Sequence, residues 1–190
     1  RCMLLVSLFY NCNTQQEATT SHHLFSKHID FPAQIIDAKI GVRGTEAATN
    51  EQVATLWDQA NTAYTSGNYA EAVSALKQIE FTDDVFETQS ESNFYYALGN
   101  AQLKQGNAEA AARSFANVTA GALSEDAVWK QALSLLAVEE QRDNAKAALS
   151  NIANSSHANS ALASNIMAEM ENMPSPPNAV ANANQVTGNI

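Results

Sequence analysis

Large apolar residues recur three or four positions apart in three windows of the chain. These windows are residues 56–79, 95–118 and 129–152, and in the first two a Gly-Asn pair interrupts the spacing. A spacing of three or four predicts an amphipathic helix, whereas the Gly-Asn pair predicts the end of one helix and the start of another. Each window is therefore predicted to form a helix, a turn and a second helix.

The three windows repeat one pattern. The second window follows the first at an offset of 39 residues, and the third follows the second at an offset of 34. At these offsets small residues align with small ones and large residues with large ones, except in the third window, where Leu133 stands where the small residue is expected. Two of the aligned sets are Ala72, Ala111 and Ala145, and Leu76, Phe115 and Leu149. A fixed repeat of this length is typical of arrays in which each unit buries its apolar face against the next.

The turn positions carry residues suited to ending and starting helices. Gly67 and Gly106 suit the left-handed conformation that closes a helix, and Asn68 and Asn107 suit the cap that opens the next one. The third window departs from this pattern, because Glu140 stands where the turn glycine is expected.

This order of large residue, small residue, Gly, Ala and large residue resembles the tetratricopeptide repeat, and the match covers about residues 53–153. The resemblance implies an all-α fold: a short right-handed superhelical array of helix-turn-helix repeats. Residues 155–173 space apolar residues four apart and are expected to form the C-terminal capping helix. The repeat domain is therefore expected to span residues 51–173. The layout as a whole is similar to bacterial membrane-anchored tetratricopeptide proteins.

The resemblance also implies where a partner would bind. In this family the first helices of the repeats line a concave groove, and the partners are usually extended peptides or helices. The side chains of this chain that would point into the groove are Trp57, Asn61, Tyr64, Tyr96, Asn100, Lys130 and Ser134. One subgroup of the family clamps a C-terminal carboxylate with several basic residues. Only Lys104 and Lys130 are near the groove, which argues against that activity.

The N-terminus begins with a basic residue followed by an apolar run, RCMLLVSLFY. The run is far shorter than the roughly 20 apolar residues that cross a bilayer. Because residue 1 is not Met, residues 1–12 are interpreted as a truncated membrane anchor, with the repeats on the periplasmic side. Two alternatives remain: a lipoprotein signal ending near Cys12, and a short buried apolar segment.

Residues 13–50 are polar and mixed, and Pro32, Gly41 and Gly44 interrupt any helical period. This segment is therefore predicted to be an extended linker. Its histidines lack the spacing of three or four that a helical metal site would need. Residues 174–190 contain three prolines and little to bury, so they are predicted to be a disordered tail.

Charge and composition narrow the function. Twenty acidic against ten basic residues give a formal net charge of −10, which would repel a phosphate backbone and disfavours nucleic acid as a partner. The two cysteines, Cys2 and Cys12, lie outside the predicted repeats. The repeat region holds one histidine, His157, and no convergent set of titratable groups. We therefore expect no catalytic site, no metal and no cofactor.

These observations favour a non-enzymatic scaffold of the bacterial cell envelope that binds a peptide or protein partner in its groove. The alternative is a structural subunit that associates with itself, as a homo-oligomer, or packs into a larger envelope assembly. A third possibility is that the array is fused to a catalytic domain lying upstream of Arg1.

Overall fold

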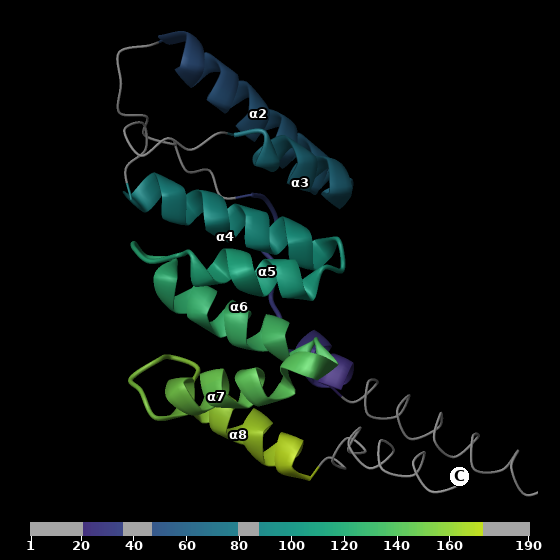
Figure 1. Ribbon diagram of the computed structural model, residues 1–190, viewed down its shortest axis with the longest axis vertical. Helices are drawn as coiled ribbons and strands as arrows, with labels where there is room; N and C mark the ends of the chain where they lie inside the picture. Colours follow the sequence, from purple (N-terminus) through teal and green to yellow (C-terminus); the bar gives the residue numbers. More distant parts are fainter. Residues whose placement is uncertain (1–20, 36–46, 80–87, 173–190) are drawn as a thin grey trace, which may run out of the picture.

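The protein is described by a computed structural model that covers residues 21–35, 47–79 and 88–172 (Figure 1). These residues contain helices joined by short turns, and no strand occurs among them. The helices after residues 21–35 are α2 (Ala47–Thr65), α3 (Tyr69–Lys77), α4 (Thr88–Lys104), α5 (Ala108–Ala116), α6 (Ser124–Leu136), the 3₁₀-helix η1 (Glu139–Gln141), α7 (Arg142–Ala153) and α8 (Ser160–Glu171). The predicted all-α fold is confirmed.

The helices pack in chain order. α2 packs against α3, α4 against α5 and α6 against α7, and each second helix also packs against the helix that follows it. Figure 1 shows the result as an elongated stack, with the α2 and α3 pair at one end and α8 at the other. The three predicted windows therefore each form a helix, a turn and a helix, and neighbouring pairs share an interior.

One large side chain from each second helix fills the space between neighbouring pairs. Leu76 is 0% exposed, Phe115 2% and Leu149 0%. Each lies in a separate core cluster that contains residues of its own pair and of the next helix along the chain. The residues aligned by the offsets of 39 and 34 thus occupy equivalent places.

A small residue in the first helix makes room for this side chain. Gly99 on α4 lies against the ring of Phe115, and a Cβ atom at position 99 would stand 2.7 Å from Phe115 Cε1. Ala60, which aligns with Gly99, is also fully buried. The close neighbour of Gly99 is therefore Phe115, the large residue of the second helix.

The turns follow the sequence where glycine is present. Gly67 and Gly106 have φ values of +80° and +88°, as expected for the left-handed residue that closes a helix. In the third pair, Glu140 cannot adopt this conformation without strain, and the turn instead contains the 3₁₀-helix η1. Asn68 and Asn107 both occupy the N-cap position, as predicted. Asn107 Oδ1 accepts a hydrogen bond from the Ala110 amide, whereas the Asn68 side chain makes no capping bond.

The last helix covers the open end of the third pair. Ala163, Ile166 and Met170 of α8 are buried in one cluster with residues of α6 and α7. Arg142 Nη2 on α7 also donates a hydrogen bond of 3.1 Å to the Met170 carbonyl. The expected capping helix is therefore present.

The structure differs from the sequence prediction in residues 21–35, which were expected to belong to an extended linker. Residues 21–28 form a helix, and Leu24 and Ile35 are each only 2% exposed. The physical reason is that the apolar side chains of this segment are buried against the helices of the stack. The predicted anchor at 1–12 and tail at 174–190 lie outside the described residues, and none of the described helices is long and apolar enough to cross a membrane.

We expect Gly99→Ala to destabilise the protein, although alanine normally favours a helix by about 1 kcal/mol over glycine. The new methyl group would collide with the Phe115 ring, and overpacking a core costs about 1–3 kcal/mol. The free energy of unfolding from denaturant titration should fall by about 1 kcal/mol. In a Phe115→Leu background the same change should instead be neutral or stabilising. An equal loss in both backgrounds would show that Phe115 is not the cause.

Candidate functional site

Residues 21–35, which we call the N-terminal segment, lie across the face of the stack formed by the first helices α2, α4 and α6. We call this surface the first-helix face. Leu24 packs in the core cluster of α6, α7 and α8. Phe25 and Ile29 contact this cluster and also the cluster of α4, α5 and α6. Ile35 packs in the cluster of α2, α3 and α4. The segment therefore crosses all three helical pairs, in the order opposite to that of the repeats.

The sequence of the segment explains its shape. Ser21, Leu24, Phe25 and His28 are three or four positions apart, so one face of a short helix carries all of them. The helix closes with a hydrogen bond of 3.0 Å from the Ile29 amide to the Phe25 carbonyl. The chain is not helical beyond residue 28, and Pro32, which has no amide hydrogen to donate, disfavours a return to helix.

Polar and aromatic contacts fix the second half of the segment. Tyr64 Oη on α2 donates a hydrogen bond of 3.1 Å to the Pro32 carbonyl. The ammonium group of Lys104 on α4 lies 4.2 Å from the centre of the Phe31 ring and 5.8 Å from that of Tyr69. A cation over an aromatic ring is attracted by the negative face of the ring. These contacts join the segment to the first two helical pairs.

A buried lysine lies within the same face. Lys130 on α6 is 4% exposed, and its Nζ donates hydrogen bonds of 2.7 Å to Tyr96 Oη and 3.1 Å to Asn100 Oδ1. It also pairs with Asp126 at 3.1 Å, and Tyr96 Oη donates a hydrogen bond to the same carboxylate. Asn100 in turn donates to the Tyr96 carbonyl at 2.8 Å. We call Tyr96, Asn100, Asp126 and Lys130 the polar cluster.

Burial controls the ionisation of these groups. It lowers the pKa of Lys130, and the negative charges of Asp126 and Asp30 oppose that shift. Burial also raises the pKa of Tyr96, and the hydrogen bond to Asp126 raises it further. The pKa of Tyr64 rises to about 12, chiefly through burial and then through the neighbouring Tyr69. Both phenols therefore remain protonated donors at neutral pH.

The residues predicted to line the groove are found on the first-helix face, but most of them are not open to solvent. The six that are buried, with exposed fractions of 8% or less, are Trp57, Tyr64, Tyr96, Asn100, Lys130 and Ser134. Tyr96, Asn100 and Lys130 come together in the polar cluster, while the Ser134 hydroxyl donates to the Lys130 carbonyl at 2.6 Å. Asn61 is partly exposed, and its Oδ1 has no hydrogen-bond partner among the described residues.

Sequence reasoning missed two parts of this site. It did not identify the N-terminal segment as the cover of the face, although Leu24, Phe25 and Ile29 are apolar residues at helical spacing within a polar stretch. It also missed Asp126, whose spacing of four from Lys130 on one helix is the signal for an ion pair.

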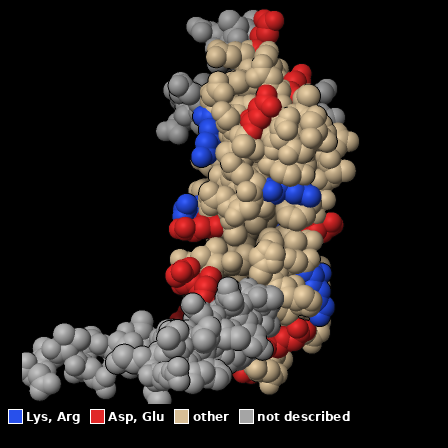
Figure 2. Space-filling model, turned by 90° about the vertical axis from the view of Figure 1, so that its right-hand side faces the viewer, with Lys and Arg blue, Asp and Glu red and all other residues tan. Residues whose placement is uncertain are grey.

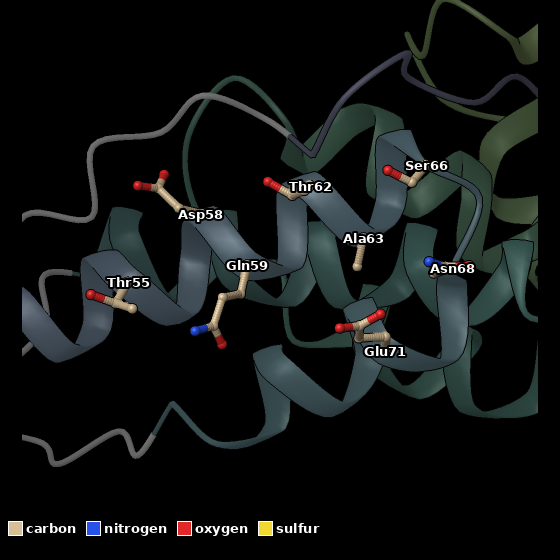
Figure 3. Close-up of a pocket in the computed structure, with 8 residues that line it drawn as sticks. All are labelled: Thr55, Asp58, Gln59, Thr62, Ala63, Ser66, Asn68 and Glu71. Carbon is tan, nitrogen blue, oxygen red and sulfur yellow. The ribbon is translucent and has the colours of Figure 1, made fainter.

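A second candidate is a hollow of about 390 Å³ beside α2 and the start of α3 (Figure 3). Its lining is mostly polar and includes two carboxylates, Asp58 and Glu71. In Figure 3 the Asp58 side chain extends away from Glu71, so the two do not converge on one point. We interpret the hollow as the solvated outer face of the first pair.

His157 has a structural position. Its Nδ1 accepts a hydrogen bond of 2.9 Å from the Asn159 amide, so its Nε2 carries the proton and donates to the Glu125 carbonyl at 2.9 Å. Its Nδ1 also lies 3.7 Å from the Glu125 carboxylate. These bonds tie the turn before α8 to the start of α6.

The face drawn in Figure 2 shows no large patch of one charge among the described residues. On the face in Figure 2, acidic and basic side chains are scattered among uncharged residues. No group of three or more His, Cys, Asp or Glu side chains is placed to hold a metal ion within the described ranges. The first-helix face is therefore the candidate functional site.

We expect Asp126→Ala to lower the free energy of unfolding by about 1–3 kcal/mol, because it leaves the buried Lys130 charge without its counter-ion. The half-exposed position of the carboxylate limits the loss. The double variant Asp126→Ala with Lys130→Met should recover part of it, since the unpaired charge is removed. Chemical denaturation of both variants measures the difference. A double variant less stable than Asp126→Ala alone would contradict this account.

Comparison with family models, with curated proteins and with solved structures gives no match for this chain. The first-helix face is distinguished by the N-terminal segment that covers it, the apolar contacts that hold this segment and the polar cluster.

Proposed function

We propose that the protein is a non-enzymatic interaction scaffold of the tetratricopeptide type, whose first-helix face binds a polypeptide segment. The observation that carries the proposal is that this face already holds a polypeptide, the N-terminal segment, across all three helical pairs. A surface that fits one peptide in a helical and then a non-helical conformation has the shape and chemistry to fit another.

The mode of contact supports peptide binding over small-molecule binding. The face receives separate side chains at separate places, with Leu24 at one end and Ile35 at the other. Between them, the Phe31 ring meets Lys104 and the Pro32 carbonyl meets Tyr64. An elongated series of small contacts of this kind matches a chain of residues rather than one compact ligand.

The polar cluster supports a binding role over a catalytic one. The Lys130 ammonium group donates to Tyr96, Asn100 and Asp126, so its three hydrogens have partners within the protein. A catalytic amine would have to be free to reach a substrate. Location in the bacterial cell envelope is also part of the proposal, and it rests on residues 1–12, which lie outside the described ranges.

The proposal can be tested with a synthetic peptide of residues 21–35 and a full-length chain carrying Leu24→Ser and Ile35→Ser, which weaken the hold of its own segment. We expect saturable binding, with NMR shifts on α2, α4 and α6 and few on the exposed positions of α3, α5 and α7. Shifts spread over the outer helices, or no saturable binding, would contradict a binding role for the face.

A matched pair of hydroxyl deletions tests the contact directly. Tyr64→Phe in the same chain removes the donor to the Pro32 carbonyl. A neutral hydrogen bond contributes about 0.5–1.5 kcal/mol, so peptide affinity should fall roughly 2-fold to 13-fold. Tyr69→Phe leaves the ring near Lys104 in place and should change the affinity little. Equal effects of the two substitutions would exclude Tyr64 as the specific contact.

A further inference from the structure

We propose that the N-terminal segment is an internal competitor: a partner polypeptide with the same side-chain pattern binds the first-helix face only when residues 21–35 leave it. This inference rests on the proposed function and adds its regulation and the chemistry of the partner. Four features of the structure carry it: the polar cluster, the completeness of the helical cores, the type of contact and an unpaired histidine nitrogen.

The polar cluster is complete without the N-terminal segment. The hydrogen-bond partners of Lys130 Nζ are Tyr96, Asn100 and Asp126, and all of them belong to α4 or α6. A surface that is always buried gains nothing from a charged group, because the group must be desolvated. A surface that meets water part of the time tolerates one. The composition of the face therefore fits a cover that can be removed.

Each helical pair has core residues of its own, although Leu24 and Ile35 of the segment are buried members of two of the clusters. Leu76, Phe115 and Leu149 are packed between helices of the array itself. Phe25 and Ile29 are only partly buried and lie at the edge of these clusters. Departure of the segment would therefore expose the face without separating one pair from the next.

Docking leaves one polar atom of the segment without compensation. Nε2 of His28 is buried and has no hydrogen-bond partner among the described residues. Burial and the neighbouring charge of Lys27 both lower the pKa of this imidazole. A buried nitrogen without a partner regains hydrogen bonds with water on release. This residue therefore weakens the hold of the segment.

The contacts define what a competing partner must carry. It needs two adjacent apolar residues on one helical turn, as in Leu24 and Phe25, and an apolar residue four positions after the second, as in Ile29. It then needs an aromatic residue for the Lys104 contact, followed by a backbone carbonyl placed to accept from Tyr64. Side chains make most of these contacts, so the pattern of residues, and not backbone pairing, would select the partner.

The tether sets the strength of the competition. A segment joined to the face by a short connection acts at a high effective concentration, in the millimolar range for short flexible linkers. The affinity of the face for a partner is then reduced by the fraction of molecules in which the face is open. A foreign peptide should bind weakly to the native chain and much more tightly when the segment is released.

The experiment compares three full-length chains for binding of a fluorescein-labelled peptide of residues 21–35, followed by fluorescence anisotropy. The chains are native, the released variant Leu24→Ser with Ile35→Ser, and a control with Ala33→Ser and Gln34→Ser at two exposed positions of the same segment. We expect the released variant to bind at least tenfold more tightly than native, and the control to match native. Circular dichroism checks that all three keep their helices.

A second release variant guards against misfolding. Phe31→Ser removes a partly buried ring that meets Lys104 and should also increase affinity for the labelled peptide. A labelled peptide with serine in place of both Leu24 and Ile29 should bind none of the chains with comparable affinity.

The outcomes separate this inference from the proposed function. Equal binding by native and released chains would overturn internal competition while leaving peptide binding in place. Absence of binding by the released chains, with their helices intact, would overturn both. A stable dimer of the native chain that dissociates when the segment is released would show that the face is filled by a second copy, and this too would overturn the inference.

Discussion

Burial of one large side chain from each second helix, between its own first helix and the next helix along the chain, determines the architecture. Leu76, Phe115 and Leu149 each occupy this place, and all are 2% exposed or less. Because the contact joins three helices and not two, it fixes how one pair sits on the next. It also explains why the first helix carries a residue as small as Gly99 or Ala60. A stack built in this way needs a covering helix at its end, and α8 provides it.

This arrangement leaves the first helices with a second face that the second helices do not cover. Three such helices side by side form a long surface that carries aromatic and aliphatic side chains, and such a surface is unfavourable if it is simply left in water. The N-terminal segment covers it, with Leu24 and Ile35 buried at its two ends. Leu24 and Ile35 are buried members of two clusters, and Phe25 and Ile29 pack against them, whereas the helical pairs supply most of the buried residues. The array can therefore fold without its cover more readily than one helical pair can fold without the next.

The repeated windows could be predicted from the sequence because their signals are local. Gly67 and Gly106 adopt the expected left-handed conformation, and the helices begin and end around them. The cover could not be predicted in the same way, because Leu24 and Ile35 pack against residues far along the chain. Pro32 and the polar neighbours within residues 21–35 obscured the helical spacing of the apolar residues, so the short amphipathic helix was not predicted. The residues expected to line a groove lie on α2, α4 and α6, as their repeat positions imply, but nothing in the sequence indicated that six of the seven are buried.

The face also has a direction. Trp57, Tyr96 and Lys130 occupy the same position in successive repeats, yet they change from an aromatic residue to a buried cation. The bound segment follows this change: Ile35 shares a cluster with Trp57, and the carboxylate of Asp30 acts favourably on the charge of Lys130. If the segment ran the other way, its acidic residue would move away from the lysine and its Phe-Pro pair away from Tyr64. Because equivalent repeat positions carry different side chains, the face selects the orientation of a bound chain as well as its side chains. A uniform apolar surface could not select an orientation.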